Sequence, residues 1–475
     1  MLTILSVATA VVAATGMVWL AVSLRGQTPR SLFLGVVIPL LGMIAWTYQA
    51  TPMVVWVVQA IIGLVTLVWT FPWWRGAARP LRLGAFWLAV PVWLIGALSP
   101  LLLGGFTVAG QRIVYGGFAV LVVLLALAAA TDGPKRGPGL PGVGTDISIG
   151  IVAGFLLCLA LLMLTGATQL FAAEHWTVDG EWGHRMADRF WGGSLLGYHP
   201  NFIGLTAVMV AMRVGPDPGF SRVQRLGACA VAGFVLILVE SRTSFVVAFV
   251  GAGVFALVHL ARSGQSWWRP WRWLSGPPAR RVAGVALAPL LATTLVFAVA
   301  GGTDLLFKNR YAQGEESGSV NGALSGRADI WGEMLADYAD GSPVELALGN
   351  PDNARGVQLS VTDPDDPDYD TQAKHTADNA LIGVLYRSGA VGLACFVLGL
   401  VIVVRRVFRT GSPPWAPVAV AALLVGSLTE DEIASTAPAW LLVCGAELAT
   451  HLAVNSRRHT GRIRPNAPVA TSPNG

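Results

Sequence analysis

Charged residues are scarce in this sequence. They make up 12% of the 475 residues, about half of the share that is usual in soluble domains, whereas residues of the AVILMFWYC set make up 54%. The mean hydropathy is +0.60, and run after run reaches the roughly 20 apolar residues that cross a bilayer. The composition therefore argues against a soluble globular protein and predicts an integral membrane protein.

Cysteine is also rare. The four cysteines, Cys158, Cys229, Cys395 and Cys444, all fall inside apolar runs. None lies in the long polar segment of the chain, so the sequence predicts neither a disulfide framework nor a CxxC metal site. The net charge of +5 mainly reflects how charge is sorted across a membrane, and we expect no nucleic-acid partner.

The apolar runs predict an all-α polytopic membrane protein with about 12–13 transmembrane helices. The first run has no basic residue before it and no small-residue cleavage site, so we expect a retained span and not a signal peptide. The predicted spans are residues 2–23, 31–49, 53–72, 84–104, 113–131, 148–170, 194–212, 226–240, 244–261, 283–301, 379–404, 416–430 and 437–454.

The short connections between these spans carry their basic residues on alternate sides. Because Lys- and Arg-rich short loops stay in the cytoplasm, we expect a cytoplasmic C-terminus and an N-terminus outside. Two segments then face outward, residues 171–193 and 302–378, and the second holds 15 acidic against 5 basic residues. Long loops outside a membrane usually carry function. The predicted divisions are N-terminal spans, central spans, outward loop, C-terminal spans and cytoplasmic tail, at residues 1–170, 171–301, 302–378, 379–454 and 455–475.

Two biased segments have simpler interpretations. Residues 262–281 interleave Trp and Arg, which favours an aromatic belt beside anionic headgroups over specific nucleic-acid or lipid recognition. The acidic run TDPDDPDYDT, residues 362–371, lacks the ordered spacing and the glycine of a calcium loop. We expect a solvated hinge there, stiffened by its prolines.

Arg242 stands between two apolar runs, in the stretch ESRTS at the predicted outer surface. Ionisable groups at membrane depth usually face the bundle interior or a water-filled cavity. A guanidinium grips phosphate with two hydrogen bonds, and Ser241 and Thr243 add hydroxyl groups beside it. The alternative is a snorkelling arginine or a local pair with Glu240.

A second arginine, Arg327, lies in the stretch LSGRADIWGEMLADYADGSP of the outward loop. Ser325 is a candidate N-cap, and an apolar stripe at helical spacing predicts an amphipathic helix that lies on the membrane or caps the bundle. Gly341 and Pro343 end it. Arg327 falls in the first turn, where free backbone N–H groups already favour an anion; the alternative is a surface arginine paired with Asp329.

Where the outward loop re-enters the membrane, the chain reads KHTADNALIGVLYRSGAVGL. His375 is a candidate general base because His is the residue most often used for that role, and Asn379 follows at i+4, one helical turn away. A lone loop histidine without a catalytic role is the alternative. Arg387 comes about two turns into the predicted span, roughly 12 Å deep. It should face protein or a polar cavity, which makes it a further candidate for contact with an anion or sugar.

His199 and Asn201 lie in GYHPNFIGL, at the outer start of a predicted span. Both are candidates for contact with substrate. A purely structural helix start, shaped by Pro200, is the favoured alternative.

These stretches, in this order and topology, resemble the O-antigen ligase/polymerase superfamily of bacterial cell-envelope glycosyltransferases. The resemblance covers roughly residues 190–450 and rests on HPN, ESRTS, LSGRADIW, LALGNPDN and HTADNALIGVLYRSGAVGL. It implies a GT-C-like membrane fold whose long extracytoplasmic loop carries amphipathic helices. It departs from the pattern after His375, where ligases often place Asn and this chain has Thr376.

The resemblance also implies an activity at the extracytoplasmic side of the cytoplasmic membrane. A glycan would move from an undecaprenyl-diphosphate carrier to an acceptor hydroxyl on a glycan, lipid or protein, without a metal or other cofactor. Arg242 and Arg327 would bind the diphosphate, and His375 would act as base. A ligase-like reaction is favoured over a polymerase by the single long loop, while a lipid-linked-oligosaccharide transporter is the alternative from another class.

Overall fold

The computed structural model describes residues 68, 82–131, 200–217, 220–239, 242–263, 327–351, 358–363, 366–374, 379–409, 411–428 and 437–462. Several predicted segments lie outside these residues: the spans 2–23, 31–49, 148–170 and 283–301, the span 53–72 apart from Val68, the outward segment 171–193, most of the Trp- and Arg-rich loop, and the tail beyond Arg462.

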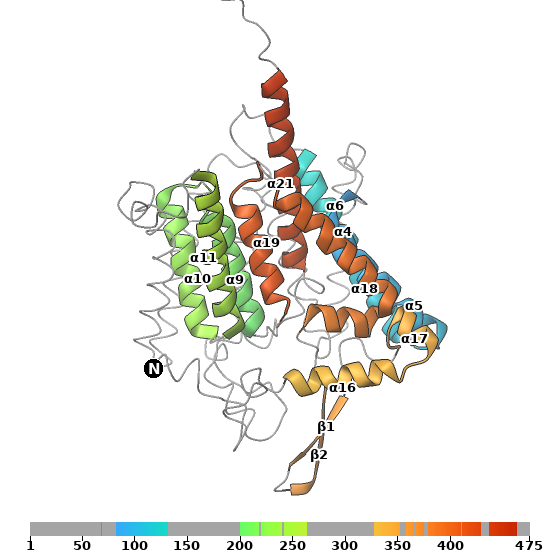
Figure 1. Ribbon diagram of the computed structural model, residues 1–475. Coiled ribbons are helices and arrows are strands. Elements are labelled where there is room, and N and C mark those ends of the chain that lie inside the picture. Colours follow the sequence, from blue (N-terminus) through green and yellow to red (C-terminus); the bar gives the residue numbers. More distant parts are fainter. Residues whose placement is uncertain are drawn as a thin grey trace, which may run out of the picture.

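The described part is mostly helical, as predicted (Figure 1). Most of its helices lie on predicted spans, but the helix at 106–131 begins seven residues before the span 113–131, and the helix at 437–462 ends eight residues beyond the span 437–454. The helices are α4 (Gly84–Gly96), α5 (Leu98–Leu102), α6 (Phe106–Thr131), α9 (Pro200–Val214), α10 (Arg222–Val239), α11 (Arg242–Ser263), α16 (Arg327–Ala339), α17 (Pro343–Leu348), α18 (Ala380–Val407), α19 (Trp415–Gly426) and α21 (Ala437–Arg462).

Two of the described segments are long and apolar enough to cross a membrane by length and composition. They are Gly84–Leu102, which joins α4 and α5, and Ala380–Val407, which is α18. Shorter apolar helices occur at Val108–Leu124, Thr243–Val258 and Trp415–Gly426. The larger number of spans and their orientation remain predictions from the sequence.

Helices α4 and α18 pack against each other in opposite directions, with glycines at the contact. The backbone oxygen of Gly399 and the side chain of Val403 lie where a Cβ on Gly84 would stand, and the backbone oxygen of Arg387 lies where a Cβ on Gly96 would stand. Small residues let two backbones approach closely, which is how apolar helices associate in a membrane.

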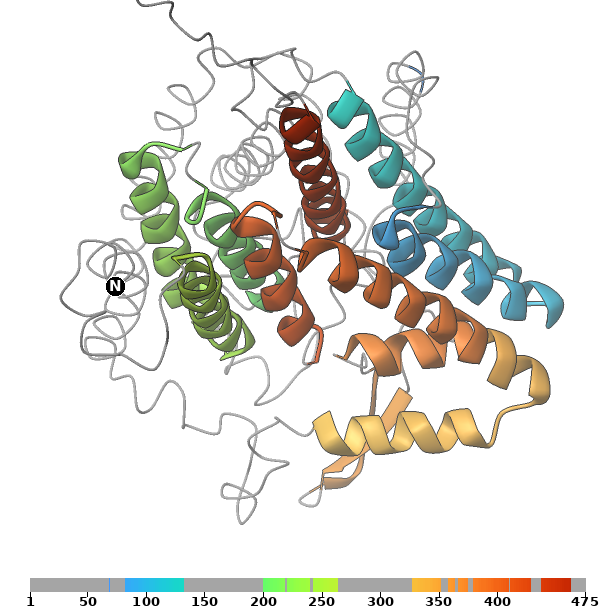
Figure 2. The same ribbon diagram turned by 45° about the horizontal axis from the view of Figure 1, so that its top comes forward.

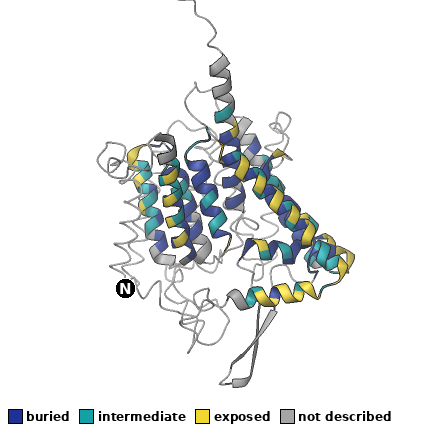
Figure 3. Ribbon diagram, viewed as in Figure 1, coloured by how far each residue is buried: buried dark blue, intermediate teal, exposed yellow. Residues whose placement is uncertain are grey.

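A second group of helices, α9, α10 and α11, packs beside α19, and α19 in turn packs on α21. Helix α19 lies in the middle of the molecule and is almost wholly buried (Figure 3). Trp415 at its start is 1% exposed and packs against Gly445 of α21. Within the group, the side chain of Met212 in α9 occupies the space beside Gly251 of α11.

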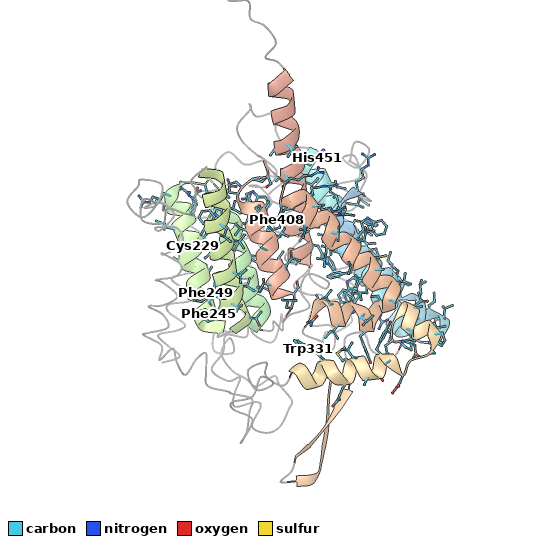
Figure 4. All side chains as sticks on the ribbon, in the orientation of Figure 1. Cys229, Phe245, Phe249, Trp331, Phe408 and His451 are labelled. Atoms are coloured by element: carbon cyan, nitrogen blue, oxygen red, sulfur yellow. The ribbon has the colours of Figure 1, made fainter. Side chains whose placement is uncertain are left out.

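Arginines gather at one end of the bundle, which we call the basic end. Figure 4 labels Phe408 and His451 at this end, near the close of α18 and on α21. The arginines of the basic end whose side chains are described are Arg82, Arg213, Arg222, Arg225, Arg405, Arg406 and Arg409.

Two ion pairs lie at the basic end, one buried and one partly buried. Arg213 pairs with Asp217 at 2.5 Å, and its guanidinium lies 4.0 Å from the ring centroid of Trp415. Glu447 pairs with Arg406 at 3.1 Å, and its carboxylate also accepts hydrogen bonds from the first two backbone N–H groups of α4, at 3.0 and 2.8 Å. Buried charge is tolerated when it is paired in this way, and these pairs fasten α9 to α19 and α4 to α18 and α21.

At the opposite end, which we call the loop end, the starts of α9, α11 and α18 meet the end of α19. The N–H of Ala380 donates to the carbonyl of Ser427 at 2.8 Å. Side chains of Leu205 and Val247 pack against Gly426. Figure 4 labels Phe245 and Trp331 at this end.

The predicted amphipathic helix is confirmed as α16, which ends at Ala339, just before Gly341; its predicted N-cap Ser325 lies outside the described residues. A second short helix, α17, follows and was not predicted. Ser342 caps it in a reciprocal capping box with Glu345, and Pro343 takes the first helical position.

The acidic run forms a β-hairpin instead of the predicted hinge. Strands β1 (Gln358–Asp363) and β2 (Asp366–Lys374) pair antiparallel, with an irregularity between Thr362 and Asp363 next to the turn. Only residues 364 and 365, which lie outside the described residues, separate the two strands in the sequence. The hairpin projects beyond α16 (Figure 1).

Candidate active site at the loop end

Helix α18 bends sharply at Gly389, where φ is +61° and ψ is −168°. Only glycine takes this conformation without strain. Figures 1 and 2 both show the section before the bend, residues 380–388, lying across the loop end beside α16, and the section after it running through the bundle along α4. The sequence predicts one continuous span at 379–404, because a glycine inside an apolar run gives no sign of a bend.

The backbone groups that the bend removes from the helix find other partners. The N–H of Asn350 donates to the carbonyl of Tyr386 at 2.8 Å. Arg112 of α6 donates through Nη1 to the carbonyl of Arg387 at 3.1 Å and to that of Gly96 at 2.5 Å. Since buried carbonyls must be hydrogen-bonded, these donors from α6 and from the second residue after α17 fix the bend in place.

Arg387 faces protein, as the sequence predicts. Its side chain is 2% exposed, and its guanidinium lies 4.3 Å from the ring centroid of Trp93, which in turn stacks on Tyr115 at 4.5 Å. The predicted depth of two turns inside a straight span does not hold, because the bend follows Arg387 at Gly389. A contact between Arg387 and an anion or sugar stays a prediction.

Asn379 caps the start of α18. Its φ of −155° is extended, and its Oδ1 accepts from the N–H groups of Leu381 and Ile382 at 3.0 and 3.2 Å. Its Nδ2 donates to the carbonyl of Leu428 at 3.0 Å. The i+4 helical relation between His375 and Asn379 that the sequence suggested is therefore wrong, since the helix begins only at the residue after Asn379.

The two arginines predicted to bind diphosphate are each the first residue of a helix. Arg242 begins α11 and Arg327 begins α16; Thr243, next to Arg242, is 8% exposed. The structure describes the backbone of both arginines but not their side chains. His375, Ser241 and His199 lie outside the described residues, and for Asn201 in α9 only the backbone is described.

The apolar stripe of α16 packs on the first section of α18. Met334 is fully buried and contacts Tyr386, and Ile330, Tyr338 and Ile382 surround this pair. Figure 3 shows that the opposite side of α16 is exposed. Of the two placements that the sequence left open, α16 thus caps the bundle.

Polar contacts reinforce this packing. The hydroxyl of Tyr386 donates to Oδ2 of Asp337 at 2.7 Å, and Nδ2 of Asn350 donates to Tyr386 Oη at 3.0 Å and to Asp337 Oδ2 at 3.3 Å. The hydroxyl of Tyr338 donates to the carbonyl of Leu346 at 2.5 Å. Partial burial raises the pKa of Tyr338, which keeps this donor protonated.

Helices α16 and the first section of α18 run side by side in the same direction in both views. Their first residues, Arg327 and Ala380, therefore lie at the same end of the pair, and His375 precedes Ala380 by five positions in the chain. The N–H of Ala380 is hydrogen-bonded to Ser427, just after the end of α19. The first part of α11 also packs there, through Val247 against Gly426. Of the three predicted residues, Arg242 and Arg327 thus begin helices whose starts lie at the loop end.

Sequence reasoning missed the residues that hold this region together. Arg112, Asp337, Asn350 and Tyr386 meet partners that are 13 to 275 positions away, and no local pattern reports such contacts. The capping box of α17 was readable from Ser342, Pro343 and Glu345 alone. In the described ranges, no group of three or more His, Cys, Asp or Glu side chains is arranged to hold a metal ion.

The comparison with protein families decides the assignment. A family model described as O-antigen ligase matches residues 227–397. Residues 227–397 are therefore similar to the O-antigen ligase family, and this supports the O-antigen ligase superfamily. No curated protein and no solved structure gave a match.

The O-antigen ligase match extends from α10 to the middle of α18. It includes both arginines, the outward loop and the bend, but not the HPN stretch at His199 and Asn201. Members of this superfamily are membrane glycosyltransferase-like ligases and polymerases, and the match supports a function of that general kind. The donor, the acceptor and the reaction are matters for proposal.

Proposed function

We propose that this chain transfers a glycan from an undecaprenyl-diphosphate carrier to an acceptor hydroxyl at the outer face of the cytoplasmic membrane. The observation that supports this most is the O-antigen ligase match over residues 227–397, which covers the two arginines that begin α11 and α16. A helix start offers free backbone N–H groups and the positive end of the helix dipole, and both favour a phosphate group.

The charge distribution supports an orientation with the loop end outside. Arginines of the described residues gather at the basic end, and Lys- and Arg-rich short loops stay in the cytoplasm. The loop end would then meet the outer headgroups, so the diphosphate would lie at their height and its isoprenoid tail would remain in the bilayer.

In the proposed reaction, Arg242 and Arg327 hold the diphosphate. His375 accepts the proton of the acceptor hydroxyl as its oxygen attacks the anomeric carbon. The glycosidic C–O bond to the diphosphate breaks, and the leaving group departs as undecaprenyl diphosphate. A single displacement of this kind inverts the anomeric carbon. The negative charge that grows on the leaving group is stabilised by the two guanidinium groups, which is stabilisation matched to the transition state.

Further residues have supporting roles in this scheme. Ser241 would donate to the same diphosphate, and Arg387, His199 and Asn201 would contact the glycan. Asn379 would act through the helix start that it caps.

The acceptor decides between two reactions of the same site. A ligase joins the glycan to a different lipid, polymer or protein, whereas a polymerase joins it to another lipid-linked glycan. We favour the ligase-like reaction on the single long outward loop, and we take the polymerase as the alternative.

Reconstitution in liposomes with a lipid-diphosphate glycan and an acceptor tests the proposal. Release of undecaprenyl diphosphate together with a glycosylated acceptor is the expected result. Movement of the intact donor across the bilayer without cleavage would instead indicate a transporter and would overturn the proposal.

A further inference from the structure

The hydrogen-bonded residues Asp337, Tyr386 and Asn350 form a cluster at the loop end that the proposed reaction does not use. Asp337 Oδ2 accepts from the Tyr386 hydroxyl at 2.7 Å and from Asn350 Nδ2 at 3.3 Å. Tyr386 is 4% exposed, whereas Asp337 lies on the exposed side of α16. The cluster joins three segments: α16, the first section of α18, and the second residue after α17.

The cluster lies too far from Arg327 to touch the same ligand group. Asp337 follows Arg327 by ten residues, about 15 Å along the helix at 1.5 Å a residue. The packed residues Met334 and Tyr338 lie near Asp337 in the same second half of α16. Most of the contacts that hold α16 thus lie in its second half, whereas Arg327 is the first residue of the helix.

The partner of Asp337 is itself held rigidly. The carbonyl of Tyr386 accepts from Asn350 N–H at 2.8 Å, and the next carbonyl accepts from buried Arg112 at 3.1 Å. The left-handed conformation of Gly389 lies three positions beyond. The backbone at Tyr386 is thus fixed by the bend. The Tyr386 hydroxyl can therefore donate to Asp337 from one position only.

We propose that Asp337 and Tyr386 are positioning residues that set the direction of α16 and, through it, the position of Arg327 against the diphosphate. The inference rests on the proposed function. A tilt of α16 by a few degrees at the cluster would displace its first residue by on the order of 1 Å, and such a displacement can cost up to about 100-fold in rate.

Three variants and one control test this in liposomes. Asp337→Ala and Tyr386→Phe each remove the 2.7 Å hydrogen bond, and the second keeps the ring packed on Met334. We expect kcat to fall about tenfold or more while KM for the lipid-diphosphate donor stays within about twofold. The reason is that the displaced Arg327 would lose the contact with the diphosphate that it makes in the transition state. Asp337→Asn keeps an acceptor oxygen and should restore kcat to within about threefold of wild type.

Glu333→Ala is the matched control, since Glu333 is another exposed carboxylate of α16. It should leave kcat unchanged. Equal losses in Glu333→Ala and Asp337→Ala, or a failure of Asp337→Asn to restore turnover, would overturn the proposal.

Combining Asp337→Ala with a substitution of either arginine separates a positioning role from general destabilisation. In an Arg327→Lys chain, the flexible ammonium depends less on helix direction, so Asp337→Ala should lower kcat less than it does in the wild type. In an Arg242→Lys chain the loss should keep its full size, because Arg242 belongs to α11. The same loss in all three backgrounds would refute an action through Arg327.

The outcome is distinguishable from a failure of the proposed function. If the wild-type chain releases undecaprenyl diphosphate and Arg327→Ala does not, but Asp337→Ala and Tyr386→Phe behave as wild type, only the positioning inference falls. If the wild-type chain cleaves no donor, the proposed function falls with it.

Discussion

Arginines at the loop end have two different surroundings, and these imply different roles. Arg112 and Arg387 are buried; one donates to backbone carbonyls and the other lies over Trp93. Arg242 and Arg327 begin helices, where unsatisfied N–H groups favour an anion. We expect the first pair to govern folding and the second pair to govern transfer.

Substitution of Arg242 or Arg327 by Ala should abolish glycan transfer while the protein still inserts, because the diphosphate would lose a charge-matched, bidentate partner. Lys variants should keep part of the activity, since they keep the charge but lose the fork. Donor cleavage in liposomes measures this. Arg409→Ala, at the exposed basic end, is the control and should transfer normally; near-normal transfer by either loop-end Ala variant would refute the diphosphate assignment.

Substitution of His375 by Ala should lower kcat by roughly 10²–10⁴, which is the usual contribution of a general base. Single-turnover measurement of acceptor glycosylation reports this step. His451→Ala, at the opposite end of the molecule (Figure 4), should leave the rate unchanged. An unaltered rate in His375→Ala would remove the base from the scheme.

At the scale of the element, the bend of α18 depends on one residue. A Cβ at Gly389 would stand 2.4 Å from the carbonyl carbon of Ala347, and the backbone there has φ +61°. Gly389→Ala should destabilise the protein by at least about 1–3 kcal/mol, the cost of such backbone strain, and thermal unfolding in detergent measures the effect.

Gly332 provides the matched comparison for this prediction. It lies within α16 and nothing stands within 4 Å of a Cβ built there. Gly332→Ala should leave stability unchanged or raise it by up to about 1 kcal/mol, because Ala is the better helix former. A Gly389→Ala protein as stable as Gly332→Ala would show that the bend does not require glycine.

Helix positions were largely predictable, because the apolar runs and the polar segments between them can be located directly in the sequence. The ends of α16 followed from its apolar stripe and from Gly341 with Pro343. The bend at Gly389 was not predictable, since its backbone is stabilised by Asn350 and Arg112, which are remote in sequence. Asn379 was taken for a helical residue because the pattern does not separate an N-cap from the turn that follows it.

At the scale of the whole molecule, the two ends of the bundle differ in charge and in what covers them. The basic end holds most of the described arginines, and its buried carboxylates Asp217 and Glu447 are paired with two of them. The loop end is covered by α16, α17 and the hairpin (Figure 1). This asymmetry could be predicted from loop charge alone, whereas the docking of α16 onto α18 could not.

Labelling of single added cysteines tests which end faces outward. Ala339→Cys on α16 and Arg409→Cys after α18 place exposed thiols at opposite ends. In intact cells a membrane-impermeant maleimide should label the first, and the second only after permeabilisation, because basic loops remain cytoplasmic. The unmodified chain, whose cysteines lie in apolar runs, is the control. The reverse pattern of labelling would contradict the orientation.

The bend of α18 also divides its length. From Ala390 to Val407 the helix measures about 27 Å at 1.5 Å a residue, close to the roughly 30 Å thickness of the hydrocarbon layer. That section alone is enough to cross the lipid. In the proposed arrangement, the preceding turns, with Asn379 at their start, would then lie along the membrane surface, at the depth of the polar head of the lipid carrier.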